Sequence, residues 1–217
     1  EDKAYSRHPG SLYRVFVRLG YRKKVESTKK KSKHNGHYDT PTELGIKWQM
    51  DVKYVPYVCY VGTDGEKFYQ YTMLEEASRK RFIYAYKENS SHSTIDFVQR
   101  AIIFFGYAPE TIQTDHGGEF THTQKTNRIH PFDILCNKLH ITHKVLRPRT
   151  PWHNGKVERS HRNDQERFYN HLSFYSYDDL QVQMKRYLYR SNNIPMSVLG
   201  WKTPNQKQYE LENIIYI

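Results

Sequence analysis

Three acidic residues stand where a carboxylate could take part in chemistry. Asp51 lies within "WQMDVKYV", Asp115 precedes His116 and two glycines, and Glu158 follows "HNG". Glycine and polar residues permit sharp turns, and turns beside regular elements commonly carry function. A carboxylate there can act as an acid, a base or a ligand for a hard cation. The alternative is an ordinary surface group, such as an i, i+4 ion pair between Glu158 and Arg162.

The balance of charge indicates a polyanionic partner. The 217 residues include 34 Lys and Arg against 23 Asp and Glu, giving a net charge of +11 and a pI near 9.5. Nucleic acid is the first candidate partner and an anionic membrane surface is the second. No apolar run approaches the roughly 18 residues that span a bilayer, and the N-terminus lacks the apolar segment of a signal peptide. We therefore expect a soluble, intracellular chain without a membrane partner.

The strands that would position these acids begin near residue 45. In residues 46–55 apolar and polar side chains alternate, which predicts a strand with Asp51 pointing away from the apolar face. A second strand over residues 67–74 follows the turn signal Asp64-Gly65, so the two can form a hairpin. A third strand over residues 79–87 predicts a mostly antiparallel start to the sheet.

Helical periodicity begins at residues 91–106, where Ser93 and Asp96 are spaced as a capping box and Gly106 is a stop signal. The next predicted strand, residues 110–115, ends at Asp115. The later predicted elements are a helix over 132–139, a strand over 141–146, and helices over 155–172 and 177–189. This order predicts an α/β fold, a five-stranded mixed sheet flanked by helices. Glu158 would lie in the first turns of a long helix.

The N-terminal region has a different character. Residues 8–24 predict a helix that starts at Pro9 or Ser11 and ends at Gly20. This helix is either the last part of a helix-turn-helix or an isolated amphipathic helix. The following stretch, "RKKVESTKKKSKHNG", predicts a basic linker, either solvated or lying along phosphates.

Three blocks of the sequence resemble a known family. They are "WQMDVKYV", "TDHGGEFT" and "RPRTPWHNGKVERSHR", and they look like the signature blocks of the DDE transposase and retroviral integrase catalytic core, especially that of bacterial insertion-sequence transposases. The resemblance covers roughly residues 42–205, including "LGWKTPNQ". It implies a ribonuclease-H-like fold and an acidic triad of Asp51, Asp115 and Glu158.

The resemblance also implies a function, namely metal-dependent DNA strand cleavage and strand transfer in transposition or integration. Two Mg²⁺ ions about 3.5 to 4 Å apart, which Mn²⁺ would replace, can activate a nucleophile and stabilise the leaving 3′ oxygen. Asp51 would bridge both ions, Asp115 would hold one and Glu158 the other. The implied partners are element-end DNA, target DNA and further copies of the chain, in a dimer or larger assembly. The implied location is the bacterial cytoplasm, at the nucleoid.

On this basis we divide the chain into four segments: the remnant of an N-terminal helix-turn-helix DNA-binding region (1–25), a basic linker (26–41), the DDE integrase-type catalytic core (42–190) and a C-terminal tail (191–217). The residues predicted to contact DNA are Lys53, His116, Asn154, Lys156, Arg159 and Arg162.

The predicted helix after residue 155 has two faces. Glu158, Arg162 and Gln165 share one face, while Val157, His161, Phe168 and Leu172 form an inward stripe beside it.

The sequence departs from the family pattern at three places. Forty-two residues separate Asp115 from Glu158, more than in the familiar members, and the extra length falls in residues 121–131. Gln165 stands where many relatives have Lys or Arg, a role that Arg162 could take. His116 stands where Asn is frequent.

Three alternatives stay open. A ribonuclease-H-like nuclease would hydrolyse DNA without joining it, and an inactive DNA-binding protein would keep the fold without catalysis. A zinc site is the third, because His130, Cys136, His140 and His143 cluster, although their spacing matches no common zinc module. Cys59 and Cys136 alone suggest no disulfide framework.

Overall fold

The computed structural model describes residues 9–22, 40–62, 65–146 and 154–214. Contacts divide the chain into two units, residues 1–37 and 38–217. The described part of the first unit contains α1 (Pro9–Arg18), after which Gly20 adopts a left-handed conformation with φ of 74°. The predicted helix is therefore confirmed, and its membership of a helix-turn-helix stays a prediction. Nearly all of the predicted linker lies outside the described residues.

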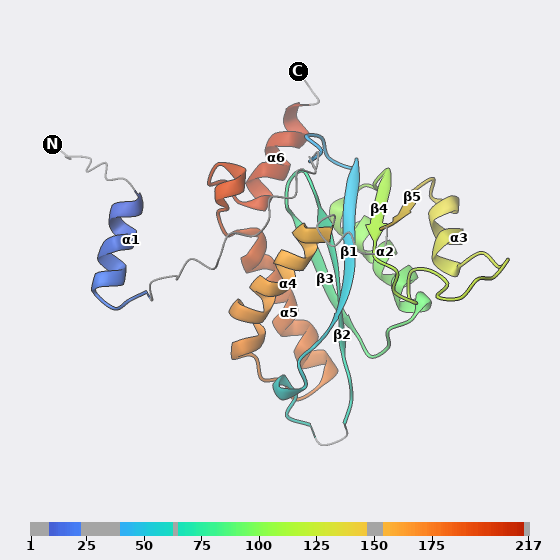
Figure 1. The fold of residues 1–217 in the computed structure, drawn as a ribbon, viewed down its shortest axis with the longest axis horizontal. Helices are drawn as coiled ribbons and strands as arrows, with labels where there is room; N and C mark the ends of the chain where they lie inside the picture. Colours follow the sequence, from blue (N-terminus) through green and yellow to red (C-terminus); the bar gives the residue numbers. More distant parts are fainter. Residues whose placement is uncertain (1–8, 23–39, 63–64, 147–153, 215–217) are drawn as a thin grey trace. The chain divides into compact units, whose positions relative to one another are not determined.

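A five-stranded mixed sheet organises the second unit, in the order β3-β2-β1-β4-β5 (Figure 1). The strands are β1 (Lys47–Tyr54), β2 (Tyr69–Glu75), β3 (Arg81–Tyr86), β4 (Thr111–Thr114) and β5 (Thr142–Val145). The first three are antiparallel, β4 runs parallel to β1, and β5 runs parallel to β4. Five predicted strands and the mixed sheet are thus confirmed.

Helices cover both faces of this sheet (Figure 1). They are α2 (Ser91–Phe105), α3 (Pro131–Lys138), α4 (Gly155–Arg167), α5 (Tyr177–Asn192) and α6 (Pro204–Ile214). Three single turns also occur: η1 (Tyr57–Cys59) after β1, η3 (Tyr169–His171) after α4 and η4 (Ser197–Leu199) after α5. No helix in the described parts of the chain combines the length and apolarity needed to cross a bilayer.

Strand alternation assigns side chains to two cores. Trp48 and Met50 of β1 pack with α2 and α3 in one apolar cluster. Ile83 and Ala85 of β3 pack with α5 and η3 in a second cluster. Successive strand residues point to opposite faces, so the odd-numbered side chains of β1, Asp51 among them, face α4.

The start of α2 differs from the prediction. Its N-cap is Ser90, whose hydroxyl accepts a hydrogen bond from Ser93 N at 3.2 Å. Asp96, assigned to a capping box, accepts instead from the Tyr86 hydroxyl at 2.6 Å. The Tyr71 hydroxyl accepts from Ser90 N at 3.2 Å and anchors the cap. Gly106 ends the helix as predicted, with φ of 84°.

The C-terminal helices also differ from the prediction. α4 ends at Arg167 rather than near residue 172, because Phe168 leaves helical geometry and stacks on Tyr187 at a centroid distance of 4.5 Å. The predicted tail contains α6, in which Leu211 is buried. Between β1 and β2 the chain forms η1, and Asp64 of the predicted turn lies outside the described residues.

Candidate active site

Strand register brings Asp51 and Asp115 together. Gln49 of β1 pairs with Gln113 of β4 in the parallel ladder, and each strand reaches an aspartate two residues later. Adjacent parallel strands lie about 4.8 Å apart, so the two backbones present their carboxylates side by side. Asp115 follows the last residue of β4, close to the strand end where the sequence predicted it, and is exposed.

Helix α4 brings Glu158 toward Asp51 and Asp115. Val157 N donates to Gln49 Oε1 at 3.1 Å, which fastens the start of the helix to β1. One turn later His161 Nε2 lies 3.0 Å from Thr72 Oγ1 on β2. Glu158 is exposed between these two attachments. The predicted inward positions of Val157 and His161 are confirmed.

The pKa of Asp51 shows that the predicted acids share one electrostatic field. Burial raises this pKa, and the negative charge of Asp115 raises it further. The charges of Glu158 and Glu119 add to the effect, against the lowering by the hydrogen bond from Val52 N, and the pKa reaches about 7. Four carboxylates therefore interact at one place.

Glu119 was not predicted as a site residue. Its carboxylate folds over Gly117, where a Cβ would lie 2.6 Å from that carboxylate, so a residue without a side chain suits the position. Gly117 N donates to Asp115 Oδ1 at 2.9 Å, and Glu119 O accepts from Thr94 Oγ1 of α2 at 3.1 Å. The available sequence signal was the acidic residue inside "TDHGGEFT".

The chemistry of these side chains fits a hard divalent cation. All four are carboxylates, and Mg²⁺ takes oxygen ligands and keeps some of its waters. Burial and the neighbouring negative charges raise the pKa of Asp51, and a bound cation would favour its ionised form. Within the described residues, no three His, Cys, Asp or Glu side chains are already gathered closely enough to enclose an ion.

The zinc alternative finds no support, because the histidine cluster, like the other described residues, includes no three possible ligands close enough together to hold an ion. His130 caps α3, accepting from Phe132 N at 3.3 Å. His143 Nδ1 lies 2.6 Å from Asp133 Oδ1, and its Nε2 lies 2.8 Å from Thr114 Oγ1. These two histidines therefore make contacts within α3, β5 and β4, the strand that leads to Asp115.

Three of the predicted DNA contacts are engaged within the fold. Lys156 forms an ion pair with the buried carboxylate of Glu76, and burial lowers its pKa to about 8. The Lys53 ammonium lies 4.5 Å from the centre of the Tyr169 ring, and burial lowers the pKa of this lysine also. Asn154 is buried at the start of α4. The structure therefore presents none of the three as a simple surface group.

The other three predicted contacts, His116, Arg159 and Arg162, are exposed. They flank the carboxylates from two elements, the loop after β4 and the outer side of α4. Gln165, in the place where relatives carry a cation, donates to Asn170 Oδ1 at 2.9 Å. Binding of DNA by these groups stays a prediction.

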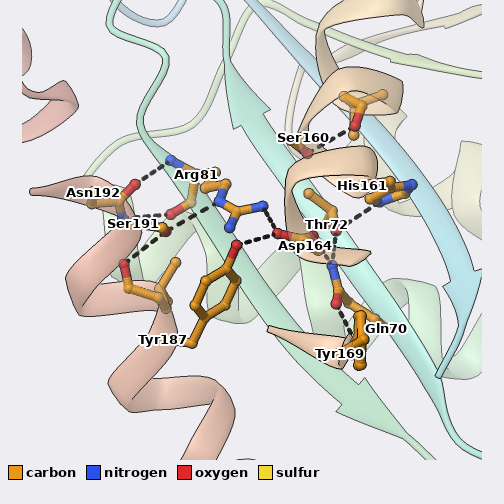
Figure 2. Close-up of polar contacts among 12 residues, drawn as sticks. Gln70, Thr72, Arg81, Ser160, His161, Asp164, Tyr169, Tyr187, Ser191 and Asn192 are labelled. Atoms are coloured by element: carbon orange, nitrogen blue, oxygen red, sulfur yellow. Dashed lines mark hydrogen bonds and ion pairs between the residues drawn. The ribbon is translucent and has the colours of Figure 1, made fainter. Parts of the chain in front are cut away.

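A buried ion pair under α4 was missed by the sequence analysis (Figure 2). Arg81 of β3 and Asp164 of α4 approach to 2.6 Å, and both side chains are almost fully buried. Burial raises the pKa of Asp164, but the charge of Arg81 and hydrogen bonds from Gln70 and Arg81 outweigh it, so the pKa is lowered. The Tyr187 hydroxyl also donates to Asp164, at 2.9 Å.

Arg81 is held in turn by the end of α5 (Figure 2). Its N–H donates to Asn192 Oδ1 at 3.1 Å, its carbonyl accepts from Asn192 Nδ2 at 2.8 Å, and its Nε donates to Ser191 Oγ at 3.2 Å. The helix that carries Glu158 is thus fixed to β3 and α5 through one charged contact.

Comparison with known proteins agrees with this geometry. Residues 41–151, just over half of the chain, match the integrase core domain family, and residues 139–204 match a second integrase core domain description. The chain belongs to the integrase core domain family. ORF3, a candidate integrase of Spiroplasma virus SpV1-C74, is 29% identical over 183 residues, which cover 80% of this chain and 49% of ORF3. This chain therefore spans about half the length of that relative.

Solved structures establish the fold. A chain of the simian T-cell lymphotropic virus intasome superposes with a TM-score of 0.61 at 19% identity, covering 83% of this chain and 60% of that one. The catalytic core of BIV integrase gives 0.59 at 21% identity, covering 80% and 99%. The HTLV-2 integrase core solved with magnesium gives 0.56 at 21% identity, covering 76% and 97%. The predicted ribonuclease-H-like fold is confirmed.

Proposed function

We propose that this integrase core cleaves DNA strands and joins them to a target, using divalent metal ions held by Asp51, Asp115 and Glu158. The observation that supports this most is the convergence of the three carboxylates. The β1 and β4 register sets two of them side by side, α4 brings the third, and the charges of Asp115 and Glu158 both raise the pKa of Asp51.

Each residue of the proposed site then has a separate role. Asp51 and Asp115 hold the inner side of the site, and Glu158 closes it from α4. When bound, two Mg²⁺ ions supply charge for the attacking and leaving oxygens of an in-line displacement. Arg159, Arg162 and His116 hold phosphates at the rim. Position and charge account for most of the catalysis.

DNA is the proposed substrate and partner, which places the protein at the nucleoid. The net charge of +11 supports this partner. Self-assembly is also proposed, because joining two ends to one target requires more than one core. The HTLV-2 core, described in trimeric and dimeric forms, and the simian intasome illustrate assembly in proteins of the same fold.

The test is strand joining in Mg²⁺ or Mn²⁺, using duplexes from the DNA that flanks the gene and comparing wild type with Asp115→Asn. We expect the variant to lose joining and to keep its DNA affinity, because Asp115 is exposed and its replacement preserves the loop. Glu110→Gln, at the other end of β4, is the matched control and should join normally. Joining by Asp115→Asn at the wild-type rate would refute the assigned role. Cleavage without joining by wild type would instead indicate a hydrolytic nuclease.

A further inference from the structure

Donor and acceptor directions can be followed from the buried ion pair to the candidate active site, starting at Gln70 (Figure 2). The amide nitrogen of Gln70 donates to Asp164 Oδ2 at 2.8 Å and to Thr72 Oγ1 at 2.9 Å. Its carbonyl oxygen accepts from the Tyr169 hydroxyl. An ionised carboxylate only accepts hydrogen bonds, so Asp164 fixes which end of the Gln70 amide faces it. Both amide protons are then committed.

Thr72 extends this chain of hydrogen bonds toward the candidate active site. Its hydroxyl already accepts a proton from Gln70 and has a single proton of its own to donate. His161 Nε2 lies 3.0 Å away, in place to accept that proton. A nitrogen that accepts a proton carries none of its own, so this arrangement requires a neutral ring with one proton. With Nε2 accepting, that proton lies on Nδ1.

The protonated nitrogen faces a candidate metal ligand. His161 Nδ1 is 3.4 Å from Asp51 Oδ2, while Asp51 Oδ1 accepts from Val52 N at 2.9 Å. Thr72 pairs directly with Asp51 across β1 and β2, so His161 lies over both residues. A formed N–H···O hydrogen bond measures about 2.7 to 3.2 Å, and such contacts tighten when an active site assembles.

We infer that His161 is a positioning residue for Asp51, held in its Nδ1–H form by the chain from Asp164 through Gln70 and Thr72. It orients the second oxygen of the Asp51 carboxylate, and Val52 orients the first. Partners that orient a ligand in this way commonly change metal affinity or activity about 10- to 100-fold when removed. This inference rests on the proposed function for its effect on joining, and on the geometry alone for the state of the ring.

The first test concerns the ring itself and needs no DNA. Two-bond ¹H–¹⁵N correlations of the full chain, labelled at histidine, report which nitrogen carries the proton. The His161 signals are the set lost in His161→Asn. We expect Nδ1–H near pH 7. A ring protonated on Nε2, or on both nitrogens, would overturn the inference whatever the chain does to DNA.

The second test uses joining and its Mg²⁺ dependence. His161→Leu keeps the bulk but removes the donor, and we expect joining to fall about 10- to 100-fold with a higher Mg²⁺ requirement. His161→Asn restores an N–H at the position of Nδ1 and should recover most of the loss. Thr72→Val should lower joining about five- to tenfold, the value of one lost hydrogen bond, and Thr72→Ser should restore it.

Ser160→Ala is the matched control, since Ser160 is buried on the same helix and its hydrogen bond among the described residues stays within that helix, to Val157 O at 2.8 Å. It should behave as wild type. If His161→Leu joins DNA as well as Ser160→Ala, the inference fails and the proposed function stands. If wild type joins nothing while His161 shows Nδ1–H, the proposed function fails and the assignment of the ring stands.

Discussion

Where β1 and β2 meet their helices, both faces of the sheet hold fully buried side chains, but of different kinds. Toward α2 and α3, β1 presents Trp48 and Met50, each 0% exposed. Toward α4, the same strand presents Gln49, also 0% exposed, and its neighbour β2 presents Gln70 and Thr72 at 0%. Apolar packing tolerates many shapes of similar volume, whereas buried hydrogen bonds require particular partners in particular directions. The face with these directional hydrogen bonds is the one that carries Asp51 and packs against α4.

This division has a consequence for the site. Apolar burial supplies the non-directional stability that holds the sheet together. The polar face sets where α4 lies, and therefore where Glu158 lies relative to Asp51. Damage to the two faces should accordingly differ in kind, since one loses stability alone and the other loses geometry as well.

The largest expected effect comes from removing one member of the buried ion pair. Asp164→Ala leaves Arg81 charged and buried, so we expect the free energy of unfolding in urea to fall by about 3 to 5 kcal/mol. Replacing both partners, with Asp164→Leu and Arg81→Met, removes the unpaired charge and should recover much of that loss.

Lys87→Ala provides the control, because Lys87 pairs with Glu66 at 2.6 Å with about half of its side chain exposed. Breaking this exposed pair should cost less than about 1 kcal/mol. Equal losses for Asp164→Ala and Lys87→Ala would mean that the buried pair does not fasten α4.

The next effect compares swaps of similar volume on the two faces. Gln70→Leu leaves Tyr169 and Asp164 each one partner short, so we expect a loss of about 2 to 4 kcal/mol. Met73→Leu, on the apolar face of the same strand, should cost less than about 1.5 kcal/mol. Urea unfolding of both variants decides the matter, and similar losses would show that the two faces are equally tolerant.

This contrast also explains what the sequence could predict. Alternation in residues 46–55 was sufficient to place β1 and to turn Asp51 away from Trp48 and Met50. It could not show that Gln49 is buried, because that depends on which helix crosses the strand. Nor could it pair Arg81 with Asp164, since "GKVERSHRNDQER" is polar apart from Val157 and Gly155 and does not mark which polar residue faces inward.

The ends of two helices and one residue of the site could not be predicted from the sequence for similar reasons. Ser90, Ser91 and Ser93 are all plausible caps for α2, and the choice depends on Tyr71, a residue on another strand. The end of α4 depends on stacking of Phe168 against α5. Asp51, Asp115 and Glu158 were placed from motif resemblance, while Glu119 belongs to the same field only because the loop folds back over Gly117.

The third prediction uses pH to test the surroundings of Asp51, which lies on the face of the sheet toward α4. In the folded chain the pKa of Asp51 is about 7, above its ordinary value of 3.8, so folding disfavours the ionised form. Stability is therefore lost as pH rises from about 4 to about 7, and the full penalty persists above that range. Asp51→Asn avoids the penalty and should stabilise the metal-free chain by about 1 to 3 kcal/mol at about pH 8.

At about pH 3 the gap between Asp51→Asn and wild type should close, because the Asp51 carboxyl is then mostly protonated in both the folded and the unfolded state. Adding MgCl₂ at the higher pH should narrow it too, since a bound cation favours the ionised wild type. Urea titrations at the two pH values measure this. A variant less stable than wild type at both pH values would mean that favourable contacts stabilise the Asp51 carboxylate, and that burial and the neighbouring negative charges do not disfavour its ionised form.

The smallest expected effect on folding separates the cations of α4. Arg159 is exposed, so Arg159→Ala should change the free energy of unfolding by no more than about 0.5 kcal/mol. If it contacts a phosphate, the slope of log affinity for duplex DNA against log salt should fall by about 1. Lys156→Met should show the opposite pattern, because its partner Glu76 is fully buried. An unchanged slope for Lys156→Met with lower stability would remove Lys156 from the predicted DNA contacts and assign it to the polar face that holds α4.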